Sequence, residues 1–156
     1  MLLSELVRRE LVFTKLPGAD APSVLRSVAE KLVATGVAID VDSLYTHLWE
    51  REKLGSTGIG DGVAIPHCKV AGLEEAVLAV AITEKGIDFG AADGEPVRVF
   101  FVLVSPSTAP AAHLQALSAI SRWLRTPGRS GKLLETRDPA TIHELLTSEE
   151  ELSDLG

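Results

Sequence analysis

Two long and almost uninterrupted apolar segments constrain this fold more than any other feature of the sequence. They span residues 76–83 and 97–104, and both are rich in β-branched side chains. Glycine and Asp-Gly turn signals bound them, which is typical of strands. A strand without alternating polar residues has to be covered on both faces. The two segments therefore predict a sheet that is sandwiched between helices.

Helical periodicity on either side of these strands supplies the covering layers. Apolar residues recur at helical spacing in five segments, at 22–35, 42–53, 110–126, 130–136 and 140–146. Short apolar segments at 12–14 and 63–65 are expected to be further strands, the first at a sheet edge. This order predicts a single layered α/β domain over residues 1–156, with its core at about 6–147 and an acidic tail at 148–156.

Composition narrows the class of protein. With 15 basic and 22 acidic side chains the formal net charge is −7, which argues against a nucleic-acid partner. A single cysteine argues against a disulfide framework and fits a reducing compartment. No apolar run approaches the roughly 18 residues that cross a bilayer, and the N-terminus lacks the layout of a signal peptide. We expect a cytoplasmic protein without direct membrane insertion.

The densest run of unusual residues lies at 51–67 and reads REKLGSTGIGDGVAIPH. Its glycines fit neither a dinucleotide-binding fingerprint nor a Walker A motif. A short strand is expected to end at Pro66, whose fixed backbone angle orients His67 directly after it. An imidazole held in this way suits a nucleophile or a proton shuttle. A histidine that is only hydrogen-bonded at a strand end fits the same pattern.

Two further residues are candidates for binding an anion. His113 falls in the first turn of the helix expected at 110–126, where N–H groups and partial positive charge favour anions. Arg51 continues the apolar stripe of the 42–53 helix, so its guanidinium should face the sheet edge and suit bidentate phosphate recognition. A half-buried capping histidine and a solvated arginine are the alternative interpretations.

Other chemistries have weaker support. The remaining histidines are expected to be structural or solvated, namely His47 and His143. Cys68 follows His67 directly, so on a strand the two side chains point to opposite faces and a catalytic pair is not expected. A zinc site on His67 and His113 would need a third ligand, for which Asp61 is a weak candidate. We expect no metal and no cofactor.

Three segments together resemble a known family: they read REKLGSTGIGDGVAIPHCKV, DGEPVRVFFVLVSP and HLQALSAISRWL. They are similar to the IIA component of the bacterial phosphoenolpyruvate-dependent phosphotransferase system, in its fructose/mannitol class and most of all its nitrogen-regulatory branch. The similarity covers about residues 6–146. It implies a mixed central sheet flanked by helices on both faces. It also implies that His67 is phosphorylated by the phosphocarrier HPr or its paralogue, while His113 and Arg51 stabilise the phosphate.

The resemblance leaves two functions open. In one, this phosphotransferase is mainly a regulator whose phosphorylation state controls binding to a transporter or a sensor kinase. In the other, it is a sugar-specific IIA protein that passes phosphate to a IIB domain. The sequence carries no fused HPr, IIB or membrane IIC segment, which favours the first function.

Two expectations concern access to His67. The family usually has glycine where this chain has Cys68, and the larger side chain could narrow the approach to His67. A phosphocarrier also needs an apolar rim for a transient encounter. The rim is expected at Ile59, Val63 and residues 105–112.

Overall fold

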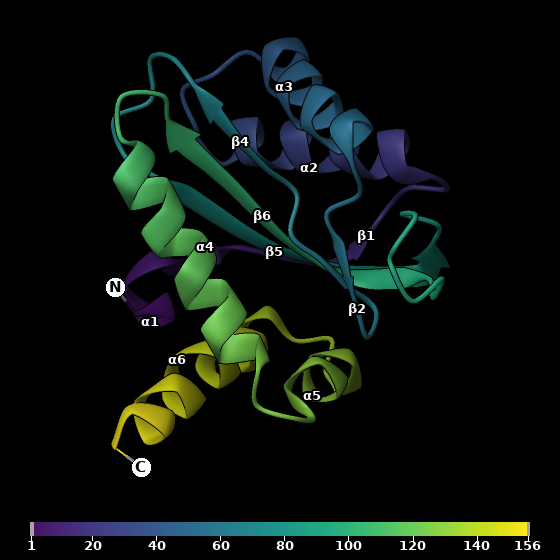
Figure 1. Ribbon diagram of the computed structural model, residues 1–156, viewed down its shortest axis with the longest axis vertical. Coiled ribbons are helices and arrows are strands. Elements are labelled where there is room, and N and C mark those ends of the chain that lie inside the picture. Colours follow the sequence, from purple (N-terminus) through teal and green to yellow (C-terminus); the bar gives the residue numbers. More distant parts are fainter. Residues whose placement is uncertain (1, 156) are drawn as a thin grey trace.

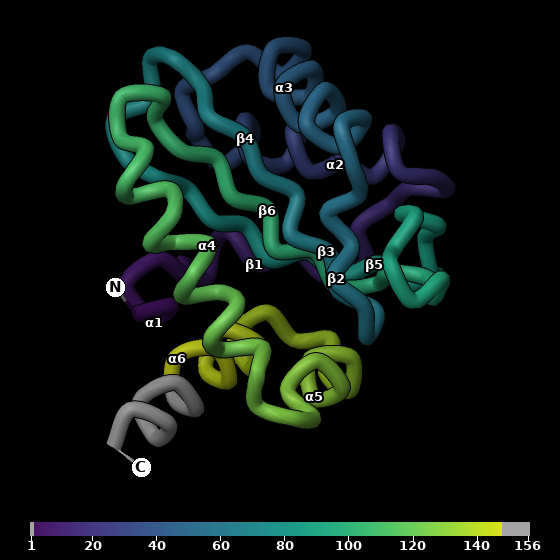
Figure 2. Tube along the Cα trace, viewed as in Figure 1, coloured from purple at the N-terminus to yellow at the C-terminus, as the bar shows by residue number. Residues whose placement is uncertain are grey.

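The computed structural model describes residues 2–155, with side chains described up to residue 147. It has a mixed six-stranded sheet between two layers of helices, as predicted (Figure 1, Figure 2). The strands are β1 (Val7–Leu16), β2 (Gly58–Gly60), β3 (Val63–Ala64), β4 (His67–Val70), β5 (Val77–Ile87) and β6 (Val97–Pro106). The helices are α1 (Leu3–Leu6), α2 (Ala21–Ala34), α3 (Val41–Leu54), α4 (Pro110–Leu124), α5 (Arg129–Glu135) and α6 (Pro139–Leu155). The predicted acidic tail at 148–156 falls outside the described side chains.

The two apolar segments form the middle of the sheet, whose strand order is β1-β5-β6-β3-β2. β4 also pairs with β6, in line with β3. β1 is parallel to β5, β5 is antiparallel to β6, and β6 is parallel to both β3 and β4. Nearly every residue of β6 is buried, because it has neighbours on both edges and helices on both faces.

Each face of the sheet has its own hydrophobic core. Alternate residues of β6 point to opposite faces, so that Phe100 packs with α2 and α3 while Phe101 packs with α1, α4, α5 and α6. Leu25 and Leu48 belong to the first core, and Trp123 to the second. The prediction of helices on both faces is therefore confirmed.

β3 ends at Ala64, close to the strand end predicted at Pro66, but pairing with β6 resumes at His67 in β4. β3 and β4 pair with the same edge of β6, and the register is unchanged between the pair Ala64↔Phe100 and the pair His67↔Leu103. Proline has no N–H to donate, but the Pro66 carbonyl still accepts from the N–H of Leu103 at 2.9 Å. His67 therefore opens the second half of an interrupted strand.

β1 is much longer than the predicted segment 12–14. It begins at Val7 and includes four charged residues, which the apolar pattern could not indicate as strand. Those residues are exposed, because β1 lies at the sheet edge and only part of it faces the core. The edge position itself was predicted correctly.

The glycine-rich segment forms the hairpin of β2 and β3. Its two-residue turn places both Asp61 and Gly62 at positive φ, of 56° and 77°, which is the conformation that favours Asp-Gly in tight hairpins. The N–H of Asp61 donates to Oδ2 of Asp93 at 3.0 Å. Asp61 is therefore a turn residue. Among the described side chains, no group of histidine, cysteine, aspartate or glutamate residues is arranged to hold a metal.

Candidate active site

A cavity of about 560 Å³ lies between the C-terminal half of α3, the strand β4 and the start of α4. It brings together the three residues that the sequence singled out, His67, His113 and Arg51. β4 pairs with β6 and lies beside α3, and α4 crosses the adjoining face of the sheet (Figure 1). Each of the three side chains thus comes from a different element.

The His67 ring is fixed by a hydrogen bond to its own strand. Its Nδ1 lies 2.7 Å from the carbonyl oxygen of Ile65. A carbonyl can only accept, so Nδ1 carries the proton and the neutral ring has its lone pair on Nε2. Burial lowers the pKa of His67, and the charges of Arg51 and Lys69 lower it further, against opposing effects of the Ile65 bond and Glu52. The imidazole is therefore neutral near pH 7.

His113 lies beside His67 with little access to solvent. The two ring centroids are 5.5 Å apart at an interplanar angle of 48°, and His113 is 5% exposed. Its Nδ1 is 2.7 Å from Oγ of Ser105. Burial lowers the pKa of His113 to about 4, with further contributions from His67 and Lys69. In the tautomer that accepts from Ser105, its Nε2–H is free to donate.

Arg51 reaches the cavity from the last turn of α3, as its place on the helix stripe predicts. One terminal nitrogen donates to the carbonyl of Gly55 at 2.9 Å. No carboxylate pairs with Arg51 among residues 2–147. Since a guanidinium has five N–H donors, most of them remain available to an anion.

Glu52 does not line the cavity, but it supports the segment beside it and was missed by sequence reasoning. It is 8% exposed, and its carboxylate accepts from both the N–H of Thr57 at 2.9 Å and the Thr57 hydroxyl at 2.6 Å. These bonds fold the glycine-rich segment against the end of α3. Ser105, the partner of His113, was missed as well, although a lone hydroxyl at the end of the apolar run 97–104 was a visible signal.

The sequence as a whole matches a known family. Residues 5–149 match the family model described as phosphoenolpyruvate-dependent sugar phosphotransferase system, EIIA 2. The chain belongs to this family. Its members are phosphoryl carriers of the phosphotransferase type.

Similar proteins come from two branches of the EIIA type 2 family. A nitrogen regulatory protein of Bradyrhizobium diazoefficiens is 36% identical over 146 residues, which are 94% of this chain and 95% of that protein. The fructose-specific EIIA component of Haloferax volcanii is 33% identical over 144 residues, 92% and 94% of the two chains. The crystal structure of the nitrogen regulatory protein IIA-Ntr from Neisseria meningitidis has a TM-score of 0.85 at 28% identity, covering 93% of this chain and 99% of that one.

Cys68, the residue after His67, is largely buried in the core of this EIIA chain. It is 8% exposed and packs in the core between the sheet and helices α2 and α3. Burial raises the pKa of the thiol to about 12. The thiol therefore keeps its proton near pH 7, although Cys68 is among the residues that line the cavity beside His67.

The expected rim of the EIIA site needs correction. Val63 is 1% exposed and belongs to the core, so it cannot form a rim. Ile59 is exposed, but neither Ile59 nor the predicted segment 105–112 lines the cavity. The large exposed apolar side chains at the cavity are Leu54 and Leu114, from the ends of α3 and α4 that face it. His47 is on the helix surface as predicted, with its Nδ1 2.8 Å from the Ser43 carbonyl, and it also lines the cavity.

Proposed function

We propose that this EIIA protein accepts a phosphoryl group from an HPr-like phosphocarrier on Nε2 of His67, and that it acts mainly as a phosphorylation-dependent regulator. The observation that carries the proposal is the bond from Nδ1 of His67 to the Ile65 carbonyl, which leaves the lone pair on Nε2. This nitrogen belongs to a ring in the same cavity as His113 and Arg51.

In the proposed transfer, Nε2 of His67 attacks the phosphorus of the donor phosphohistidine in line. The new N–P bond forms as the donor N–P bond breaks, and its electron pair returns to the donor imidazole. Positive charge develops on the His67 ring, and the Ile65 carbonyl stabilises it through Nδ1–H. Arg51 and the Nε2–H of His113 hold the phosphoryl oxygens, because phosphoryl transfer depends mainly on positioning and charge stabilisation.

The surface around the cavity supports a short-lived encounter with a protein partner. Leu54 and Leu114 are 84% and 67% exposed and stand at the cavity. A small apolar patch of this kind suits a weak, transient interface. Phosphorylation would add about −1.5 to −2 of charge to it, which provides the switch between partners. The proposed partners after HPr are a regulated transporter or sensor kinase in the cytoplasm.

The alternative is a sugar-specific EIIA that passes phosphate to a IIB domain. The 33% identity to a fructose-specific EIIA component supports it nearly as well as the 36% identity to a nitrogen regulatory protein supports the regulator. Transfer of phosphate from this protein to a fructose- or mannitol-type IIB domain would favour the alternative.

The phosphoryl acceptor is tested by mass spectrometry of the intact protein. The protein is incubated with enzyme I, HPr and phosphoenolpyruvate, and its mass is followed over time. We expect the wild type to gain one phosphoryl group, His67→Gln to gain none, and His113→Gln to gain it slowly. His143→Gln is the matched control, because His143 lies on α6 and does not line the cavity. Phosphorylation of His67→Gln would refute the proposal.

A further inference from the structure

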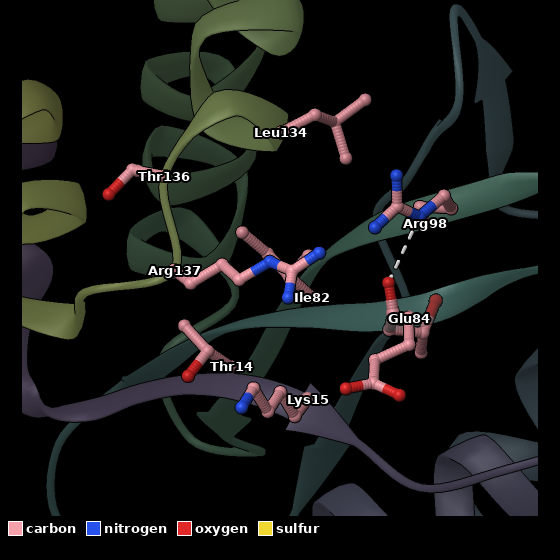
Figure 3. A pocket seen from close by; sticks show the side chains of 9 residues that line it. Thr14, Lys15, Ile82, Glu84, Arg98, Leu134, Thr136 and Arg137 are labelled. Carbon is pink, nitrogen blue, oxygen red and sulfur yellow. Dashed lines mark hydrogen bonds between the residues drawn. The ribbon is translucent and has the colours of Figure 1, made fainter.

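A second hollow, of about 100 Å³, lies where β1 ends and β6 begins (Figure 3). Three cationic side chains line it, Lys15 from β1, Arg98 from β6 and Arg137 from the segment between α5 and α6. Glu84 is its one carboxylate. None of its lining residues lines the cavity at His67. The hollow is therefore a separate feature of the fold.

The edge strand is distorted where it lines this hollow. Between the pairs Phe13↔Ala81 and Leu16↔Thr83, β1 contains one residue more than β5. Lys15 lies in this bulge with φ of 58°, a left-handed conformation that residues other than glycine rarely adopt. Bulges re-aim side chains, and strained residues of this kind gather at binding sites.

The neighbouring strand is irregular at the same level. Between the pairs Ile82↔Val99 and Ile87↔Val97, β5 contains three residues more than β6. The Thr83 hydroxyl donates to the carbonyl of Lys85 at 2.7 Å inside this irregular segment. The pairing of β1 with β5 and the pairing of β5 with β6 are therefore both irregular beside the hollow.

The guanidinium of Arg98 is oriented by a hydrogen bond from its Nε. Its Nε donates to the carbonyl of Thr83 at 3.0 Å. In Figure 3 the guanidinium of Arg137 extends from its loop toward that of Arg98, and Glu84 lies below Arg98 with its carboxylate toward Lys15. Within residues 2–147, neither arginine nor Lys15 forms an ion pair with a carboxylate.

This charge arrangement is unexpected in an acidic protein. The chain carries a net charge of −7, yet three cations face one small hollow with a single carboxylate among them. Like charges that face the same space repel one another unless a counter-charge lies between them. Arginine forks match the oxygen geometry of phosphate, and two hydroxyls, of Thr14 and Thr136, add further polar contacts.

We propose that this hollow binds a phosphate dianion, either inorganic phosphate or the phosphate group of a small organic monoester. Arg98 and Arg137 donate to its oxygens, and Lys15 contributes a point charge. The apolar side chains of Ile82 and Leu134 form a wall of the hollow that would accommodate a short organic group. The site is independent of phosphate bound at His67.

Calorimetric titration with inorganic phosphate and, separately, with glycerol phosphate tests the site. The protein carries Arg51→Gln and His67→Gln, so that the active-site cavity cannot account for binding. In this background Arg137→Gln should weaken binding by about tenfold or more, because hydrogen bonds to charged groups are strong. Arg125→Gln is the matched control, since Arg125 is an exposed arginine outside the hollow, and it should leave the affinity unchanged.

The two probes distinguish the sources of the phosphate. Equal affinities would identify a site for inorganic phosphate, and at least tenfold tighter binding of glycerol phosphate would identify a site for a monoester. Lys15 is also exposed, and Lys15→Gln should weaken the binding of whichever probe the wild-type hollow binds. The inference is overturned if neither probe gives saturable binding, or if Arg137→Gln and Arg125→Gln bind equally well. Phosphorylation of His67 is measured separately and does not enter this result.

Discussion

Nδ1 of His67 donates a hydrogen bond to the carbonyl of Ile65, two residues earlier on the same interrupted strand, at 2.7 Å. The N–H of Ile65 donates to the carbonyl of Thr57 at 3.0 Å. The backbone N–H and carbonyl of Ile65 therefore lie on the edge of the strand opposite to β6. β2 pairs with β3 only as far as Ala64, and beyond it the imidazole takes the carbonyl that a neighbouring strand would have used. The sheet edge itself therefore selects the tautomer of the proposed nucleophile.

The pH below which phosphate uptake by His67 slows should depend on Arg51. Burial, followed by the charges of Arg51 and Lys69, lowers the pKa of His67, so phosphate uptake should stay constant from pH 8 to about 6.5 and fall only below that. Arg51→Gln removes a cation and should raise the pKa of His67, which moves the fall to higher pH. NMR titration of the His67 ring measures this directly. Lys53→Gln is the control, and a pKa that stays constant or falls in Arg51→Gln would contradict the account.

His113 should make the protein less stable in mild acid. Its pKa is lowered to about 4 in the folded state and is about 6.5 in the unfolded state. Between these values only the unfolded chain binds the proton, so stability is complete above pH 6.5 and decreases as the pH falls toward 4. This protonation of His113 lowers the free energy of unfolding by up to about 3 kcal/mol. Urea unfolding at pH 7.5 and pH 5 should show a smaller loss for His113→Gln than for the wild type. His143→Gln should behave like the wild type, and equal losses in all three proteins would rule the effect out.

Glu52→Ala should destabilise the fold and slow phosphate uptake. The buried N–H and hydroxyl of Thr57 would lose their acceptor, at a cost of about 1–3 kcal/mol. Glu30→Ala is the matched control, because Glu30 is exposed on α2 outside the cavity and pairs with Arg26 at 3.8 Å. We expect the free energy of unfolding to change by less than about 0.5 kcal/mol for Glu30→Ala. Thermal unfolding of the two variants makes the comparison, and equal melting temperatures would show that the Glu52–Thr57 bonds do not stabilise the site.

Cys68→Gly should affect stability more than access to His67. Cys68 is packed in the core between the sheet and helices α2 and α3, so removing its side chain leaves a small cavity and adds backbone freedom. The expected loss is about 1–2 kcal/mol. The rate of phosphate uptake should change little at a temperature where the variant is folded. A marked rise in that rate would instead show that Cys68 narrows the approach to the site.

The sequence predicted the layers of the fold well but the strand boundaries less well. The apolar runs in β5 and β6 predicted buried strands clearly, because nearly every residue in them is apolar and suits burial on either face of the sheet. β1 was predicted too short, since charged residues on an edge strand give no apolar signal. Pro66 correctly indicated a break in the strand, but not that the register with β6 continues across the break. Register depends on the partner strand and is not encoded in a single segment.

The site was predicted in the same uneven way. The helix stripe placed Arg51 toward the sheet, and the resemblance to the IIA family paired His67 with His113, which spacing alone could not do. Glu52 was not predicted, because its role depends on a chain reversal at Gly55 that brings Thr57 back to it. The rim at Val63 was wrong, because a residue in an apolar segment is as easily buried as exposed.

The most direct test of the central claim is a long-range proton–nitrogen NMR spectrum of the phosphorylated protein with ¹⁵N-labelled histidines. The account predicts that the phosphoryl group is on Nε2 of His67, while Nδ1 keeps its proton and its bond to the Ile65 carbonyl. The nitrogens of His113 should then show no phosphorus coupling. Phosphorylation on Nδ1 of His67, or on either nitrogen of His113, would contradict it.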